Sequence, residues 1–216
     1  MKHFLILGVV ALLASGCKRE KDAELTFVSK FGGEPYVGSV KAAIEVPGES
    51  SRQEYGRASL QLLDSTNNIV RLILFGAIDD EGGQAGDVGF VLDGTAANTE
   101  WSFHKDPMQL KIDGNGNVSG GMETSDERYA YSGTLSPSEF RIETVVERLT
   151  PTQGGYPAGT IFRFEHTGRR EDPNAPPAGD GGDSGSGCNE IRWELRNVWN
   201  PGGGAMSLVR VPVCYN

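Results

Sequence analysis

Apolar and polar residues alternate in short runs along most of this chain. Between residues 25 and 170 the runs are interrupted roughly every ten residues by Gly, Asn, Asp, Pro or Ser, a spacing typical of antiparallel sandwiches and barrels. We therefore predict an all-β domain, sandwich or barrel, over residues 25–170. The predicted strands are Leu25–Lys30, Gly38–Val46, Arg57–Leu63, Ile69–Phe75, Val88–Leu92, Trp101–His104, Met108–Ile112, Val118–Glu123, Arg128–Leu135, Glu139–Leu149 and Thr160–Arg169.

Two of these segments indicate which of their faces are buried. In the last strand, Phe162, Phe164 and His166 share one face and charged residues such as Arg163 lie on the other, which predicts a strand with one wet side. Ile69–Phe75 is apolar at nearly every position. This pattern predicts a central strand that is covered on both faces.

Residues 50–63 allow a second interpretation. Ser51 and Glu54 have the spacing of a helix capping box, and Ala58 and Leu62 share one helical face. A glycine in the middle of the segment disfavours a helix. A helix is therefore the alternative to the strand predicted here.

The C-terminal part of the chain has a different composition. Residues 171–187 are rich in Pro, Gly, Asp and Ser, which predicts a flexible linker or a long surface loop. After it, Ile191 and Trp193 alternate with charged residues, and Leu208–Cys214 forms a second apolar segment. We predict a β-hairpin over residues 188–216 that docks on the β domain, because a lone two-stranded hairpin is only marginally stable.

Residues 1–16 have the parts of a secretory signal peptide. Lys2 and His3 are basic, Phe4–Leu13 is apolar but too short to span a bilayer, and small residues precede Cys17. Small residues directly before a cysteine resemble the lipobox of bacterial lipoproteins. The resemblance implies that the Cys17 sulfur receives a diacylglyceryl group and that acyl chains such as palmitate anchor the mature protein durably. A plain secretory signal with an unmodified thiol is the alternative.

The residues after the lipobox indicate to which membrane the mature protein is expected to be sent. Residues 17–24 comprise the lipidated cysteine and a short charged tether. Lys18 stands where enterobacterial lipoproteins retained in the inner membrane carry Asp, so the resemblance implies the outer membrane, on its periplasmic or surface face. The first expected partner is therefore the lipid bilayer, through acylated Cys17.

The net charge narrows the classes of partner. The formal charge of the full sequence is −9 at pH 7. Removal of the signal peptide, which contains Lys2, makes the charge more negative by one. An acidic protein is poorly suited to bind nucleic acid. We expect no nucleic-acid partner, and the second expected partner is a protein or glycan of the cell envelope.

The cysteines other than Cys17 form an even pair, Cys188 and Cys214. In an exported protein, where the compartment is oxidising, such a pair is expected to form a disulfide. The predicted bond would close the base of the C-terminal hairpin. Two free thiols in a reactive or metal site are the alternative.

No catalytic set of residues emerges. Gly182–Gly185 is similar to the segment around the nucleophile of chymotrypsin-like serine proteases, but it lies in the linker and neither His104 nor His166 has that family's sequence context. For these two histidines we expect hydrogen-bonded or exposed positions at a rim.

Asp113, Asn115 and Asn117 have the oxygen spacing that begins a calcium-binding loop. Val118 and Thr124 occupy the places at which an EF-hand carries Gly and an acidic ligand. A hairpin turn explains the same residues, and calcium remains the alternative. We predict no cofactor and no metal site.

An aromatic set is the candidate binding surface. Trp101, Phe103, Tyr129 and Tyr131 could line a hydrophobic mouth for a ligand, with core packing as the alternative. We therefore expect a non-catalytic envelope lipoprotein that binds or caps another envelope component. The alternatives are a hydrolase of envelope polysaccharide or peptide that uses scattered carboxylates, and a structural or assembly lipoprotein.

Overall fold

The computed structural model describes residues 26–65, 67–79, 85–151, 155–170, 188, 190–200 and 205–215. About 72% of these described residues are in strands and 3% are in a helix. The elements are α1 (Phe27–Phe31), β1 (Tyr36–Glu45), β2 (Arg52–Asp64), β3 (Ile69–Asp79), β4 (Ala85–Ala97), β5 (Glu100–Lys105), β6 (Met108–Ile112), β7 (Asn117–Glu123), β8 (Glu127–Leu135), β9 (Glu139–Arg148), β10 (Ile161–Arg170), β11 (Glu190–Asn200) and β12 (Ala205–Tyr215).

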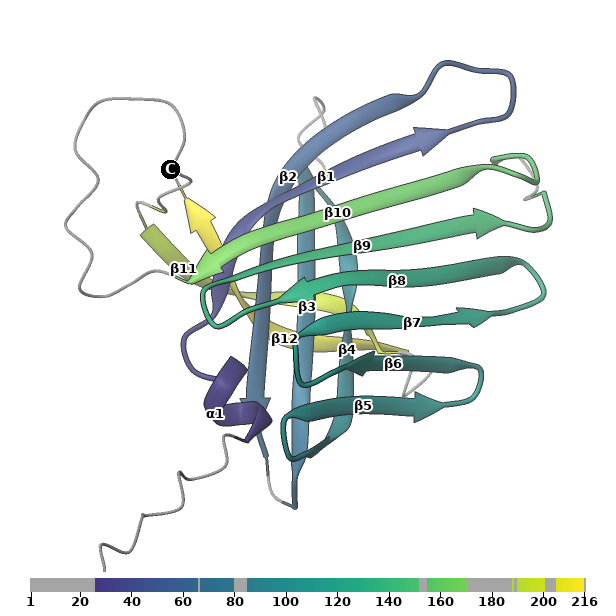
Figure 1. The fold of residues 1–216 in the computed structure, drawn as a ribbon. Coiled ribbons are helices and arrows are strands. Elements are labelled where there is room, and N and C mark those ends of the chain that lie inside the picture. The colour runs from purple at the N-terminus through teal and green to yellow at the C-terminus, as the bar shows by residue number, and fades with distance from the viewer. Residues whose placement is uncertain are drawn as a thin grey trace, which may run out of the picture.

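Strands β1 to β10 close into an antiparallel barrel (Figure 1). The order of neighbours is β4-β3-β2-β1-β10-β9-β8-β7-β6-β5, and β5 returns to β4. The closing contact is short and pairs Thr95 with Ser102, Ala96 with Trp101 and Ala97 with Glu100. The predicted all-β fold class is confirmed, and of the two predicted forms the chain adopts the barrel.

Ten of the eleven strands predicted in residues 25–170 are present as β1 to β10. Their ends differ from the prediction by a few residues, most in β4, which continues to Ala97 because it also pairs with β5. The helical alternative for residues 50–63 is wrong. Those residues pair with both β1 and β3, so the segment is β2.

The strand predicted at Leu25–Lys30 is also wrong, because the described part of that segment forms the helix α1. The Thr26 side chain caps the helix by accepting a hydrogen bond from the backbone N–H of Ser29 at 3.2 Å. Phe27 and Phe31 are four residues apart, so both lie on one helical face, and both are fully buried.

Helix α1 closes one end of the barrel. Its two phenylalanines insert into the main core, with ring centroids 5.1 Å apart. The backbone N–H of Phe27 donates to the carbonyl of Asn98 between β4 and β5, and Lys30 Nζ donates to the carbonyl of Gly114 between β6 and β7. These contacts fix α1 across the turns at this end, which Figure 1 shows at the lower left.

The β11–β12 hairpin packs on the outer face of β3 and β4. Val198, Val209, Val211 and Val213 form a second apolar cluster with outward side chains of the barrel, among them Phe75. The inward side chains of β3, including Leu72 and Leu74, belong to the main core. The prediction that Ile69–Phe75 is covered on both faces is therefore confirmed for Leu72–Phe75, whereas Arg71 on the outer face is exposed.

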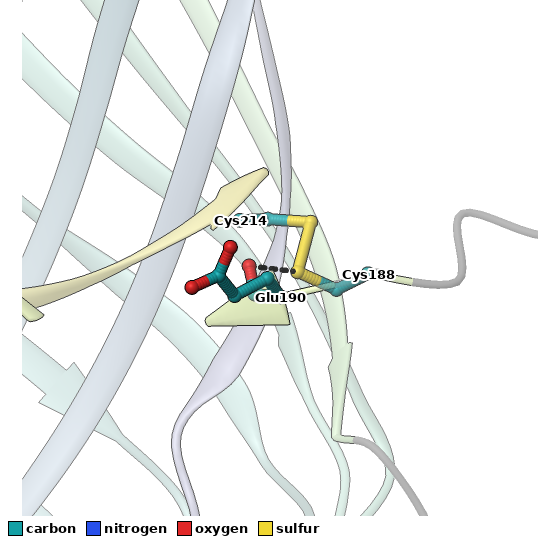
Figure 2. The surroundings of a disulfide bond; sticks show 3 residues. All are labelled: Cys188, Glu190 and Cys214. Atoms are coloured by element: carbon teal, nitrogen blue, oxygen red, sulfur yellow. Dashed lines mark hydrogen bonds between the residues drawn. A yellow bond between two sulfur atoms is a disulfide. The ribbon is translucent and has the colours of Figure 1, made fainter. Parts of the chain in front are cut away.

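The predicted disulfide between Cys188 and Cys214 is present (Figure 2). The two Cα atoms are 5.4 Å apart, and the carbonyl oxygen of Glu190 lies 3.1 Å from Sγ of Cys188. Because Cys188 precedes β11 and Cys214 lies near the end of β12, the bond closes the base of the hairpin as expected.

Several predictions fall outside the described residues. They concern the signal peptide (residues 1–16), the lipidated cysteine with its tether (residues 17–24), the linker (residues 171–187) and the turn of the C-terminal hairpin. In the described ranges, no helix has the length and apolar character needed to cross a membrane.

Candidate functional site

A cavity of about 280 Å³ lies inside the barrel, toward the end opposite α1. We call it the aromatic cavity. Its walls come from β4, β8, β9, β10 and β11, and they combine apolar and aromatic side chains with a few polar groups. The lining residues are Val88, Gly89, Phe90, Glu127, Tyr129, Tyr131, Thr144, Val146, Arg148, Phe162, Phe164, His166 and Trp199.

Strand alternation places these side chains. Successive residues of a strand point to opposite faces, so every second residue of β8, β9 and β10 faces the interior. The contributions are Glu127, Tyr129 and Tyr131 from β8, Thr144, Val146 and Arg148 from β9, and Phe162, Phe164 and His166 from β10. Glu127 and Arg148 are the terminal residues of their strands, so they lie at the rim, and His166 lies deepest along β10.

The rim of the cavity carries an ion pair. Arg148 Nη1 lies 3.1 Å from Glu127 Oε1, and the two side chains are 20% and 24% exposed. The hydroxyl of Tyr129 donates a hydrogen bond to the other Glu127 oxygen. Burial and the neighbouring Glu127 carboxylate raise the pKa of Tyr129, so it stays protonated at neutral pH. The Nε of Arg148 is buried without a hydrogen-bond partner among the described residues.

His166 is the buried polar group of the cavity. Its side chain is 1% exposed, and neither ring nitrogen makes a hydrogen bond of normal geometry with any described residue. Burial lowers the pKa of the imidazole to about 4, against the opposing effect of the nearby backbone of Ile142 and Phe164. The ring is therefore neutral at pH 7.

A glycine makes room for this imidazole. A Cβ atom at Gly76 of β3 would lie 3.1 Å from His166 Nε2 and 2.9 Å from a methyl group of Val88. Both distances are shorter than ordinary van der Waals contact. The small residue in β3 therefore lets the ring of His166 extend across the interior of the barrel.

The C-terminal hairpin also contributes to the cavity. Trp199 of β11 lies beside Phe90, the residue through which β11 pairs with β4 in parallel. The indole stacks on the ring of Tyr129, with centroids 5.8 Å apart and planes inclined by 26°. The disulfide-closed hairpin therefore supplies one wall of the cavity.

The structure separates the four aromatic residues predicted as a binding surface. Tyr129 and Tyr131 line the cavity. Tyr131 also packs edge-on against Phe90, with ring centroids 5.2 Å apart. Trp101 and Phe103 belong to the main core, as Tyr131 does, but they do not line the cavity. Trp101 is fully buried, and its Nε1 donates a hydrogen bond to the carbonyl of Val70 at 2.9 Å.

Sequence reasoning missed three of the residues that shape the cavity. His166 was placed on the correct face of its strand, but we expected a hydrogen-bonded or exposed position, and it is buried and unpartnered. Trp199 was expected only to dock the C-terminal hairpin on the sheet, and its place in the wall of a cavity was not predicted. Arg148 carried no local signal, because it is the last residue of β9. His104, by contrast, is exposed on β5 as expected.

The other candidate sites either form a hydrogen-bonded turn or lie outside the described residues. One Asp113 oxygen accepts hydrogen bonds from the backbone N–H groups of Asn115 and Asn117, and the other accepts from the Asn117 amide. The carboxylate thus closes the turn between β6 and β7. The described ranges hold no cluster of three His, Cys, Asp or Glu side chains that could bind a metal. The segment Gly182–Gly185 is outside them.

No protein-family model matches this chain, and no curated protein matches it with significant similarity. The candidate site therefore depends on its own geometry. An apolar cavity with a few polar groups is the usual form of a site that binds a small molecule or a projecting group of a larger one. Its volume is close to the lower limit of about 300 Å³ for such sites.

Proposed function

We propose that this chain is a lipid-anchored, non-catalytic binding protein of the cell envelope, and that the aromatic cavity is its binding site. The anchor is Cys17, by resemblance to bacterial lipoproteins, and the expected location is the outer membrane. The envelope component that binds would place a small molecule or a single projecting group inside the barrel.

The observation that carries this proposal is the combination of apolar walls with a buried, unpartnered polar group. Buried polar groups in folded proteins nearly always have hydrogen-bond partners, and an exception requires an explanation. At His166 the exception lies on the wall of a cavity. A bound molecule that supplies the missing hydrogen bond explains why an imidazole is retained there.

The charges at the rim favour binding over catalysis. Glu127 is already held by Arg148 and Tyr129. Hydrolysis of a glycoside by carboxylates needs two such groups on opposite sides of the scissile bond. Because Glu127 is engaged in an ion pair, its role here is to hold the rim in place.

The test uses a variant that fills the cavity and a control on the same strand. Val146→Phe places a ring inside the cavity, whereas Val145 lies on the opposite face of β9 and Val145→Phe leaves the cavity unchanged. We expect native mass spectrometry of protein purified from its own envelope to show a bound small molecule in the wild type and in Val145→Phe.

The same adduct should be missing from Val146→Phe, with circular dichroism confirming that both variants keep the β fold. An adduct retained by folded Val146→Phe would place the binding site elsewhere. Crosslinking in the intact envelope, followed by mass identification of what Cys17-anchored protein touches, then shows whether a larger component carries the bound group.

A further inference from the structure

The aromatic cavity has two chemically different parts. Most of its wall is formed by hydrocarbon and aromatic groups, among them Phe90, Tyr131, Val146 and Phe164. His166 is the polar side chain that lies deepest along β10, the hydroxyl groups of Thr144 and Tyr131 are the other buried polar groups of the wall, and the charged groups are confined to the rim. A ligand that fills the cavity must match this division.

The apolar wall determines the body of the ligand. A sugar ring carries hydroxyl groups on its whole circumference, and each one that meets this wall would lose a hydrogen bond to water without replacement. A charged ligand would lose still more, since the rim charges of Glu127 and Arg148 already neutralise each other at 3.1 Å. The wall therefore selects an uncharged molecule with an apolar body.

His166 determines the polar end of the ligand. A neutral imidazole presents one N–H donor and one nitrogen acceptor, and neither makes a hydrogen bond of normal geometry with a described residue. A hydroxyl group both donates and accepts, so it satisfies whichever ring nitrogen faces it. The burial that keeps this ring neutral also removes the positive charge that would favour a carboxylate or phosphate.

Building on the proposed function, we infer that the ligand is a small uncharged molecule with an apolar body and one hydroxyl group. The hydroxyl lies at His166 in the depth of the barrel, and the body lies against the aromatic wall between Tyr131 and Phe164. Trp199, on the hairpin, covers the side of the body that faces β4.

The test compares two probes of nearly equal shape, para-ethylphenol and para-ethyltoluene, which differ only in a hydroxyl in place of a methyl group. Calorimetric titration of the wild type should give tighter binding of the phenol. In His166→Phe the ratio of the two affinities should change by about tenfold in favour of the toluene, because one buried hydrogen bond of about 1.4 kcal/mol is lost. His104→Phe, at an exposed position of β5, is the matched control.

A second measurement uses the wild type alone and does not depend on the folding of any variant. Nitrogen resonances of the His166 imidazole should shift on addition of para-ethylphenol and remain in place with para-ethyltoluene. If both probes bind with equal affinity and neither shifts the His166 resonances, the hydroxyl inference is overturned while the cavity remains a binding site. If neither probe binds the wild type, the inference on the ligand fails, whereas the proposed function fails only if the native mass spectra of the wild type also show no bound small molecule.

Discussion

His166 and Trp101 are both buried side chains with a ring N–H, but their surroundings differ. Trp101 Nε1 donates to the Val70 carbonyl, whereas the ring nitrogens of His166 have no partner among the described residues. A buried polar group without a hydrogen bond costs roughly 1–3 kcal/mol of stability. Trp101 therefore belongs to the structural core, whereas His166 lowers the stability of the fold at the wall of the cavity.

The protonation of His166 predicts a pH dependence of stability. The pKa of the imidazole is about 4 in the folded chain and about 6.5 in an unfolded one, so the unfolded chain binds the additional proton between these values. The free energy of unfolding should therefore fall as the pH is lowered from about 6.5 to about 4, by up to roughly 3 kcal/mol.

The measurement is urea denaturation at several pH values in this range. His166→Phe should lose this component of the pH dependence, and His104→Gln, at an exposed position, should retain it. Carboxylates contribute equally to all three proteins, so the difference between them isolates His166. Identical pH profiles for the wild type and His166→Phe would contradict the prediction.

At the scale of elements, the local pattern of apolar residues was sufficient to predict most strands. It failed where contacts with a distant element decide the secondary structure. Met108–Ile112 alternates strictly and is flanked by turn residues, so both ends of β6 were predicted. Phe27 and Phe31 fit a short strand as well as a helix, and α1 forms because both rings are buried in the end of the barrel. The burial of this pair depends on residues that follow much later in the chain.

The hairpin of β11 and β12 has two roles, since it covers β3 and carries Trp199 into the cavity wall. Removing the disulfide with the double substitution Cys188→Ser and Cys214→Ser should lower the free energy of unfolding by about 2–4 kcal/mol, because the unfolded chain loses a crosslink. We also expect faster amide hydrogen exchange in β3 and β4, which hydrogen-exchange mass spectrometry would detect.

Treatment with a reductant is the control for this prediction. It should destabilise the wild type to the level of the double variant and leave the double variant unchanged. In the untreated wild type, both thiols should resist alkylation. A double variant as stable as the oxidised wild type, with unchanged exchange in β3, would show that the hairpin is held by packing alone.

At the scale of the whole molecule, the fold class was predictable from the sequence and the closure was not. Val88–Leu92 has the same alternation in a sandwich as in a barrel, and only the pairing of Thr95–Ala97 with Glu100–Ser102 distinguishes them. The cavity was predicted in part, because Tyr129 and Tyr131 were expected at a ligand mouth. Its other walls could not be predicted, since they depend on which strands lie opposite one another.

The proposed attachment of the molecule to a membrane gives the last prediction. Cys17→Ser should yield uncleaved precursor or soluble protein, because serine lacks the sulfur that, by the proposal, accepts the diacylglyceryl group. Membrane fractionation and the mass of the N-terminal peptide provide the measurement. The double substitution Cys188→Ser and Cys214→Ser should remain in the membrane fraction. Processed Cys17→Ser protein that still sediments with membranes would show that the anchor is something other than lipid.

The neighbours of strand β4 show that the fold is complete only after the C-terminal end of the chain has been synthesised. It is bound by β5 only at Thr95–Ala97, and at Phe90 its neighbour is β11, which is synthesised about a hundred residues later. A product truncated before β11 would therefore present Ile73, Phe75 and Val91 uncovered to other chains. Full-length and prematurely terminated molecules would thus differ in the exposure of this apolar face.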